Sequence, residues 1–443
     1  MHDSQYGELT SHDSSIHGIQ GYPVSRPTTA VIGAGVAGLT AAYLLQRQYD
    51  VTLFEAEPRL GGHAHTHEVP SQSGGTVAVD SGFIVHNERT YPNLIRLFAE
   101  LGVPTQDSDM SMSVRCLECG LEYAGGKRLA GLLPRLDHLR RMDYLRMLGE
   151  ITRFQRRARR FLEQDGPDQI TFGAFLRAGA HSQYFIEHFA IPLVSAVWSA
   201  GERVSLRYPA RYLFEFLSNH GMLSTGSSFR WKTVVGGSRN YVERAAKNLN
   251  AVHAGTSVRA VTRHAMGVEI RDRAGEAHWA DRVVIATHAD QALALLDDPT
   301  RAEREVLGAF TYSRNETWLH NDASVLPSQP RARASWNYLK TTCGGDADGV
   351  GITYHMNRLM RLPTPDDYLV TLNPAGRVNP DRVIATMTYE HPVYTPESLA
   401  AQRRLPGLNG PRTAYAGAYH GWGFHEDGCA SGVRAAASFG AGW

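Results

Sequence analysis

Six residues near the N-terminus constrain the fold of this chain most strongly. Gly33-Ala34-Gly35-Val36-Ala37-Gly38 joins a short apolar run, Thr28–Ile32, to a segment of small and apolar residues, Leu39–Leu45. This order predicts a strand, a tight glycine turn and a helix, the first unit of a dinucleotide-binding fold. The glycines permit the turn, the approach of a pyrophosphate and close helix packing, while the helix N-terminus attracts phosphate. The predicted nucleotide contacts in this unit are Gly33, Gly35, Val36, Ala37 and Gly38.

A second predicted strand, Asp50–Phe54, ends at an acidic residue. Glu55 follows the first glycine by 55 − 33 = 22 positions, the spacing at which a carboxylate accepts the hydroxyls of a ribose. This acid disfavours a 2′-phosphate but does not distinguish FAD from NAD, since both carry a free ribose. We find no second glycine motif with strand and helix context, which disfavours the two-dinucleotide design of the pyridine-nucleotide disulfide reductases.

The next residues resemble a known family. Glu55–Ala64 is similar to the extended N-terminal signature of the flavin-containing amine oxidase superfamily, which includes protoporphyrinogen oxidases and phytoene desaturases. The resemblance implies that the cofactor is FAD and that the paired glycines pass close to it. The cofactor contacts implied in this stretch are Ala56, Arg59, Gly61, Gly62 and His63.

Three later segments extend the resemblance. Val79–Phe83 is similar to the family's segment that returns beside the flavin, and Val234–Ser238 to the glycine pair that opens a later helix. Gly255–Val261 is expected to place Val258 near the adenine. Asp281–Thr287 reads as a buried parallel strand, because its centre, Val283–Ala286, is a continuous run of apolar residues.

The C-terminal segment is the most specific. Ala414–Gly417 predicts a short strand, and the loop Gly421–Gly428 leads into a helix of small residues. In the resembled family this helix points at the flavin's pyrimidine edge, where its dipole stabilises the reduced cofactor. Alternatively, the acidic residues simply occupy a favourable first helical turn. The cofactor contacts expected here are Gly417, Gly423, Phe424, His425 and Glu426, and the candidate catalytic residues are His425 and His63.

These segments predict an α/β fold. A discontinuous Rossmann-type FAD-binding domain is expected to carry an inserted mixed α+β substrate domain. The N-terminal residues lack the apolar segment of a secretory signal, so we expect a flexible leader. The predicted ranges are 1–27 for the leader; 28–100, 234–300 and 411–443 for the FAD domain; and 101–233 and 301–410 for the substrate domain.

Three further segments narrow the resemblance. Leu319–Asp322, Ser335–Tyr338 and Gly421–Gly428 look most like a bacterial branch of predicted NAD/FAD-binding oxidoreductases. Members of that branch are associated with cyclopropane-fatty-acid-synthase-like methyltransferases, which implies a lipid substrate and a methyltransferase partner. Aromatic residues between 310 and 419 are candidates for lining an apolar tunnel, although aromatic residues more often belong to a core: Tyr312, Trp318, Trp336, Tyr338, Tyr354 and Tyr419.

The leading functional hypothesis is hydride transfer between the flavin and an apolar substrate, such as an unsaturated or methyl-branched acyl chain. A second is an amine oxidase that releases hydrogen peroxide, although we cannot place the lysine that many such enzymes use near the flavin. A third is a non-catalytic flavin-binding accessory to a methyltransferase. The formal net charge of +1 gives no reason to expect nucleic acid.

Composition favours a cytoplasmic protein, since only 4 cysteines occur and no apolar run is long enough to cross a membrane. Residues 127–160 carry eleven Lys or Arg against three acids, a balance of 11 − 3 = +8. Their apolar residues recur every three positions, so we expect Gly149 to divide the segment into two helices. Such a pair could contact an anionic membrane peripherally or present a solvated basic face.

Two further patterns involve possible metal ligands. His63, His65 and His67 alternate, so on one strand they would share a face, as metal ligands, flavin neighbours or packed residues. Cys116 and Cys119 predict a hairpin turn. A redox dithiol or half of a zinc site is the alternative, but without a second pair we predict no metal site. His86, His288 and His355 are weaker candidates for a functional role.

Overall fold

A parallel five-stranded sheet assembled from distant parts of the chain forms the centre of one lobe. Its strand order is β10-β2-β1-β14-β20, and every neighbouring pair is parallel. The glycine turn leads from β1 into α1, which packs against the C-terminal helix α15. These elements are β1 (Thr28–Ile32), α1 (Val36–Leu45), β2 (Asp50–Glu55), β10 (Ala251–Ala254), β14 (Arg282–Ile285), β20 (Thr413–Tyr415) and α15 (His425–Ser438).

This computed structural model describes residues 26–72, 74–125, 128–164, 170–223, 229–344, 351–374 and 376–443. The predicted leader, 1–27, therefore lies almost entirely outside the described residues.

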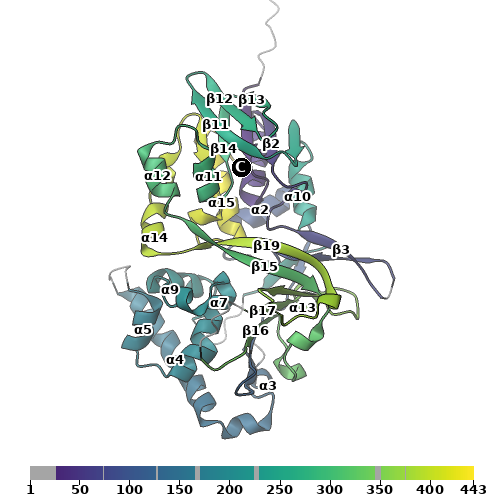
Figure 1. Cartoon of the computed structure of the whole chain (residues 1–443), viewed down its shortest axis with the longest axis vertical. Coiled ribbons are helices and arrows are strands. Elements are labelled where there is room, and N and C mark those ends of the chain that lie inside the picture. The colour runs from purple at the N-terminus through teal and green to yellow at the C-terminus, as the bar shows by residue number, and fades with distance from the viewer. Residues whose placement is uncertain are drawn as a thin grey trace, which may run out of the picture.

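Smaller elements surround the parallel sheet. An antiparallel sheet, β11-β12-β13, lies at the top of the molecule in Figure 1, and a three-stranded sheet, β5-β9-β6, joins segments from both predicted domains. The bounds are β3 (Thr66–Pro70), β4 (Thr76–Asp80), β5 (His86–Asn87), α2 (Pro92–Leu101), β6 (Thr105–Asp107), β9 (Trp231–Val234), α10 (Arg239–Ala246), β11 (Val258–His264), β12 (Gly267–Asp272), β13 (Ala277–Ala280), α11 (Ala289–Leu295), α12 (Arg301–Leu307) and α14 (Pro396–Gln402).

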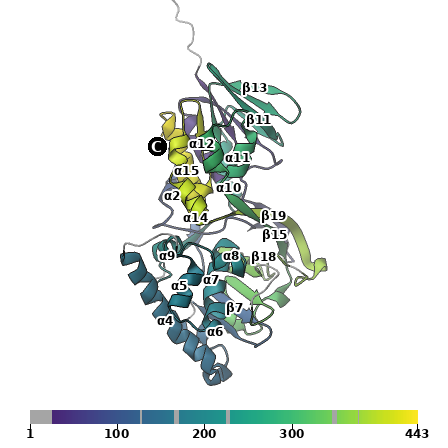
Figure 2. The ribbon, with the colours of Figure 1, turned by 60° about the vertical axis from the view of Figure 1, so that its left-hand side comes forward.

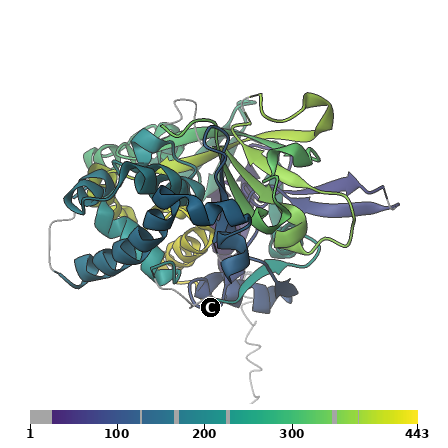
Figure 3. The ribbon, with the colours of Figure 1, turned by 90° about the horizontal axis from the view of Figure 1, so that it is seen from below.

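The second lobe pairs a seven-stranded sheet with a group of helices. The order is β19-β15-β18-β17-β16-β7-β8, antiparallel except between β16 and β7. The long strands β15 and β19 cross the middle of the molecule (Figure 1), and the view from below separates the helices from the sheet (Figure 3). The sheet comprises β7 (Met112–Cys116), β8 (Glu122–Gly125), β15 (Thr311–His320), β16 (Trp336–Lys340), β17 (Ile352–His355), β18 (Leu369–Leu372) and β19 (Val383–Val393).

Helices α4 to α9 of this lobe lie together in Figure 2 and enclose an aromatic core, whereas α13 packs against β17 and β18. Phe154 of α4 sits at the centre of this core, with its ring within 5.7 Å of both Phe185 and Phe214. The helices are α3 (Arg128–Leu132), α4 (Met142–Glu163), α5 (Phe172–Ala178), α6 (Gln183–Phe185), α7 (Ile191–Trp198), α8 (Glu202–Ser205), α9 (Ala210–Asn219) and α13 (Met356–Met360), with the 3-10 turn η1 (Leu136–Arg140) and the π-helical turn η2 (Ile186–Ala190).

The prediction that Gly149 divides the basic segment is wrong. α4 runs unbroken through Gly149, which is exposed and would meet nothing within 4 Å if it carried a Cβ. A glycine costs a helix only about 1 kcal/mol, and the burial of one stripe of α4 offsets that cost. The buried stripe consists of Tyr144, Met147, Glu150, Phe154 and Ala158. Across the described residues, no helix is both long and apolar enough to cross a membrane.

Candidate active site

A cavity of about 950 Å³ connects the two lobes. One end is formed by the carboxyl ends of β1 and β2, the place where ligands bind in open α/β sheets. The other end reaches Trp336 and Tyr354 on the seven-stranded sheet. A cavity of this volume that reaches both lobes can hold a dinucleotide at the first end and an organic substrate at the second.

The glycine turn forms a cradle beside this cavity. Gly33 has φ +98°, a left-handed conformation that glycine adopts without strain. Gly35 begins α1 without any side-chain cap, and a Cβ on it would meet nothing within 4 Å. A Cβ on Gly38 would overlap the carbonyl oxygen of Gly33, so this glycine serves helix packing. The open space at Gly35 and the uncapped N–H groups of α1 fit a pyrophosphate.

Glu55 ends β2 at the rim of the cradle. Its carboxylate accepts hydrogen bonds from the backbone N–H groups of Ala34 at 2.7 Å and Glu57 at 2.9 Å. Val258, at the start of β11, lines the same end of the cavity. A carboxylate in this position fits the ribose hydroxyls of a dinucleotide.

The segment after Glu55 folds back onto the glycine turn. Gly61 donates its N–H to the carbonyl of Ala34 at 2.8 Å, and Arg59 Nη1 donates to the carbonyl of Gly62 at 2.8 Å. A Cβ on Gly62 would lie 3.2 Å from Cα of Gly35. This close approach explains why position 62 is a glycine. Ala56, Arg59 and Gly62 line the cavity, whereas Gly61 does not.

The N-terminus of α15 faces the cavity from another side. Gly417, Gly423, Phe424 and His425 line the cavity at this helix start. Glu426 points elsewhere, because its carboxylate accepts hydrogen bonds from the backbone N–H groups of Asn93 and Leu94 at the start of α2. Glu426 also lies in the first turn of α15, as its alternative interpretation expected, but its carboxylate contacts the start of α2.

His63 lies in the middle of the cavity wall. Its ring is 4.9 Å from that of Tyr389 and 5.5 Å from that of His391, both on β19. Burial and the neighbouring His391 hold the pKa of His63 well below its ordinary value. Nε2 of His63 is buried without a protein partner. A neutral imidazole with an unused nitrogen fits a hydrogen bond to a bound group.

His425 is held on two sides. Its ring stacks on Phe83, with centroids 3.8 Å apart, and its Nε2 lies 2.7 Å from the hydroxyl of Tyr241. Burial lowers the pKa of His425 to about 3, so the imidazole is neutral at pH 7. Phe83 belongs to the segment expected to return beside the flavin, and it lines the cavity as well.

The expectation that His63, His65 and His67 share a strand face is wrong. β3 begins at Thr66, so His63 lies in the preceding turn. The rings of His65 and His67 are 4.0 Å apart but face Tyr389 and Ser81. Of the weaker candidates, His288 lines the cavity, His86 packs against Phe98, and His355 pairs with Asp367 at 2.9 Å.

Aromatic and apolar side chains enclose the substrate-lobe end of the cavity. Trp198 of α7, Phe216 of α9 and Trp422 surround Phe424 there. Of the aromatic residues expected to line a tunnel, Tyr312, Trp336, Tyr354 and Tyr419 do so, whereas Trp318 and Tyr338 do not. Sequence reasoning missed Val197, Trp198, Phe216 and His220, because no motif distinguishes them from core residues.

Most charged side chains of the cavity lie at its nucleotide end, and the exceptions are Arg314 of β15 and Glu390 of β19. Of its three carboxylates, Glu55 and Glu57 lie at the nucleotide end. The third, Glu390, is 3.3 Å from Nδ1 of His288 and 3.5 Å from Nε of Arg314. Among the described residues that line the cavity, none is a lysine.

The fold and this cavity define the chain as a dinucleotide-binding protein of the α/β class. The sequence model of the family described as flavin containing amine oxidoreductase matches residues 36–313, more than half of the chain. The chain belongs to that family. The fold class and the FAD cofactor predicted from the sequence are thereby confirmed.

Individual relatives are more distant. The protein named as flavin-containing monoamine oxidase AofH of Mycobacterium tuberculosis is 28% identical over 284 residues, which are 61% of this chain and 58% of that protein. The chain thus matches less than two thirds of this relative's length. Among solved structures, cyclohexylamine oxidase from Brevibacterium oxydans has a TM-score of 0.66 at 17% identity, covering 94% of this chain and 98% of that one.

A fatty acid isomerase from P. acnes has the same fold. Its TM-score is 0.64 at 17% identity, over 92% of this chain and 97% of that one. At this identity the likeness shows the fold alone. Because both an amine oxidase and a fatty acid isomerase have this fold, it does not decide the substrate.

Proposed function

We propose that this enzyme transfers a hydride between FAD and an apolar substrate, with an unsaturated or methyl-branched fatty acyl chain as the substrate class. One observation carries the proposal: the substrate-lobe end of the cavity is aromatic and apolar, and its described lining holds neither a lysine nor an unpaired carboxylate. A buried ammonium ion without a counter-charge is costly. A hydrocarbon chain gains free energy from the same surroundings.

In this proposal the chain's own residues bind and orient both reactants. Gly33, Gly35, Glu55 and Arg59 hold the dinucleotide, and the loop before α15 holds the isoalloxazine ring. FAD supplies hydride transfer at its N5 atom. His63 and His425 are both neutral, so they position groups through hydrogen bonds and ring contacts rather than through charge.

Contact with a lipid surface is part of this proposal. At the end of the molecule remote from the β11–β13 sheet (Figure 1), four apolar side chains around α3 and η1 are exposed. Exposed arginines accompany them, including Arg135, Arg140 and Arg146. This combination suits an anionic membrane surface. The exposed fractions are 73% for Leu129, 83% for Leu136, 51% for Leu139 and 73% for Met142.

The second candidate function is amine oxidation. It is favoured by the family and by the aromatic walls, because aromatic faces attract cations. Product analysis separates the two functions. The holoenzyme is incubated aerobically with a panel of amines and with acyl substrates, and hydrogen peroxide and altered acyl chains are measured. We expect modified acyl chains and no amine-dependent peroxide; peroxide with amines alone would overturn the proposal.

A further inference from the structure

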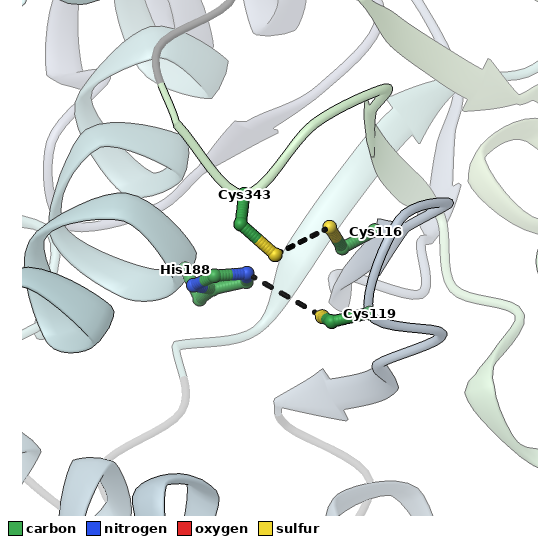
Figure 4. Close-up of side chains that lie close together, drawn as sticks. All are labelled: Cys116, Cys119, His188 and Cys343. Atoms are coloured by element: carbon green, nitrogen blue, oxygen red, sulfur yellow. Dashed lines mark hydrogen bonds between the residues drawn. The ribbon is translucent and has the colours of Figure 1, made fainter.

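Four potential metal ligands from three distant segments meet in the substrate lobe (Figure 4). Cys116 and Cys119 flank the turn between β7 and β8, His188 lies in η2, and Cys343 follows β16. Sγ of Cys116 is 3.7 Å from Sγ of Cys343, and Sγ of Cys119 is 3.7 Å from Nε2 of His188. All four ligand atoms lie within 4.8 Å of one another.

The spacing indicates a single ion. Two thiolates bound tetrahedrally at about 2.3 Å from one metal stand about 3.8 Å apart. The ligand atoms here are close to that separation, and they are too near one another to surround an iron–sulfur cluster, whose irons occupy the space between them. Three thiolates and one imidazole form one of the common structural zinc sets.

His188 is already oriented as a ligand. Its Nδ1 lies 3.1 Å from the carbonyl oxygen of Tyr184, which can only accept a hydrogen bond. The proton therefore resides on Nδ1, which leaves the lone pair of Nε2 directed at the cysteines. The ring of His188 also stacks on that of Tyr184, with centroids 4.2 Å apart.

Hydrogen bonds that do not use the four ligand atoms join the three segments, and the one that reaches η2 runs from the hydroxyl of Tyr123 to the carbonyl of His188 at 2.7 Å. Cys343 donates its N–H to Glu118 at 2.6 Å, and Leu117 donates its N–H to Lys340 at 2.9 Å. Arg141 Nη1 donates to the carbonyl of Cys119 at 2.9 Å. These contacts fix the positions of the ligand residues without a bound metal, as expected of a preformed metal site.

We propose that Cys116, Cys119, Cys343 and His188 bind one Zn²⁺ in a closed, four-coordinate structural site. Binding forms three Zn–S bonds and one Zn–N bond, and the three thiol protons are released to solvent. None of the four residues lines the cavity. The site instead ties the β7–β8 hairpin and β16 to η2, which continues into α7 and its cavity residues Val197 and Trp198.

The test uses the full-length holoenzyme purified without chelators. Elemental analysis should find about one zinc per chain, and Co²⁺ exchanged into the protein should give the intense visible absorption of a tetrahedral thiolate site. Cys343→Ser and His188→Ala should lose zinc. Cys429→Ser alters a buried cysteine on α15, far from the cluster, and should retain it. Bound FAD reports whether each variant is folded.

Several results would overturn the proposal. They are a reduced wild-type protein that binds neither Zn²⁺ nor Co²⁺, stoichiometric iron in place of zinc, or a Cys116–Cys343 disulfide found by mass spectrometry in freshly purified protein. Full zinc retention in a folded Cys343→Ser protein would also reject the ligand set. Loss of zinc with FAD retained in that variant supports the ligand set. Because FAD binding is measured separately from zinc content, failure of the zinc proposal does not contradict the proposed function.

Discussion

At the scale of single residues, two glycines of the nucleotide turn have different tasks and can be separated. Gly35→Ala places a methyl group in open space at φ −70°, so folding should be nearly unchanged while FAD binding weakens by at least about tenfold. Gly38→Ala overlaps the Gly33 carbonyl and should lower the free energy of unfolding by about 1–3 kcal/mol. Urea unfolding and FAD titration measure the two effects. Equal FAD affinity in Gly35→Ala would contradict the placement of the pyrophosphate.

Glu55 offers a second test at this scale. Glu55→Ala removes the proposed ribose partner and should weaken FAD binding by about 10- to 100-fold, the range of a hydrogen bond to a charged group. Glu68→Gln, an exposed partner of Arg239, is the matched control. Fluorescence of released FAD after gel filtration provides the readout. Stoichiometric FAD in Glu55→Ala would refute the assignment.

Much of the nucleotide end could be predicted from such residues. The contacts proposed for the glycines and Glu55 use the backbone and one carboxylate, so the spacing of these residues along the chain predicts them. Trp198 and Phe216 could not be predicted as cavity residues, because whether an aromatic ring faces a core or a cavity depends on how two distant helices pack. The contacts of Glu426 could not be predicted either, because its carboxylate accepts hydrogen bonds from the start of α2, which is distant in the sequence.

At the scale of elements, the α3–η1 surface carries the membrane proposal. The triple change Leu136→Ser, Leu139→Ser and Met142→Ser should reduce sedimentation with phosphatidylglycerol vesicles several-fold, because the apolar contact is lost. Binding to phosphatidylcholine vesicles should be weak for every variant, because it lacks the charge attraction. The control is Met266→Ser, an equally exposed residue, 85% accessible, between β11 and β12. Equal sedimentation of the triple variant and wild type would contradict this surface.

α4 and the β7–β8 hairpin show which features a local sequence pattern does not predict. The three-residue recurrence of leucines suggested a break at Gly149, but tertiary packing selects a different stripe and keeps the helix continuous. The Cys116–Cys119 pair was correctly predicted as a hairpin turn. Its remaining partners, His188 and Cys343, stand 69 and 227 residues from Cys119 and Cys116. No local spacing can connect ligands so far apart.

At the scale of the whole molecule, buried neutral histidines set the pH dependence of stability. Burial lowers the pKa of His391 to about 4 and of His420 to about 3. The unfolded chain binds protons below about pH 6.5 while these folded imidazoles do not, so stability falls as pH decreases through that value. Asp427 has the opposite effect. Burial raises the pKa of its carboxyl group to about 7, so its contribution to the free energy of unfolding is present at low pH and is lost as pH rises toward 7.

His391→Gln tests this balance. An imidazole whose pKa falls from about 6.5 to about 4 on folding lowers the free energy of unfolding by about 1.5 kcal/mol between pH 6.5 and pH 5. The variant should therefore lose less stability than wild type over that interval. Denaturant unfolding at both pH values measures the difference. The exposed His264 supplies the control, as His264→Gln. An unchanged pH slope in His391→Gln would show that folding does not lower the pKa of His391.

The most direct test of the central claim, an apolar substrate for a flavin enzyme, is the anaerobic absorption of the holoenzyme at about 450 nm, where oxidised flavin absorbs. Oxidised enzyme is mixed with saturated or methyl-branched acyl chains, photoreduced enzyme with unsaturated ones, and oxidised enzyme with amines. We predict that either saturated or methyl-branched chains bleach the band of the oxidised enzyme, or unsaturated chains restore the band of the photoreduced enzyme. Amines should leave the band unchanged. Bleaching by amines, with neither acyl class reacting, would contradict the claim.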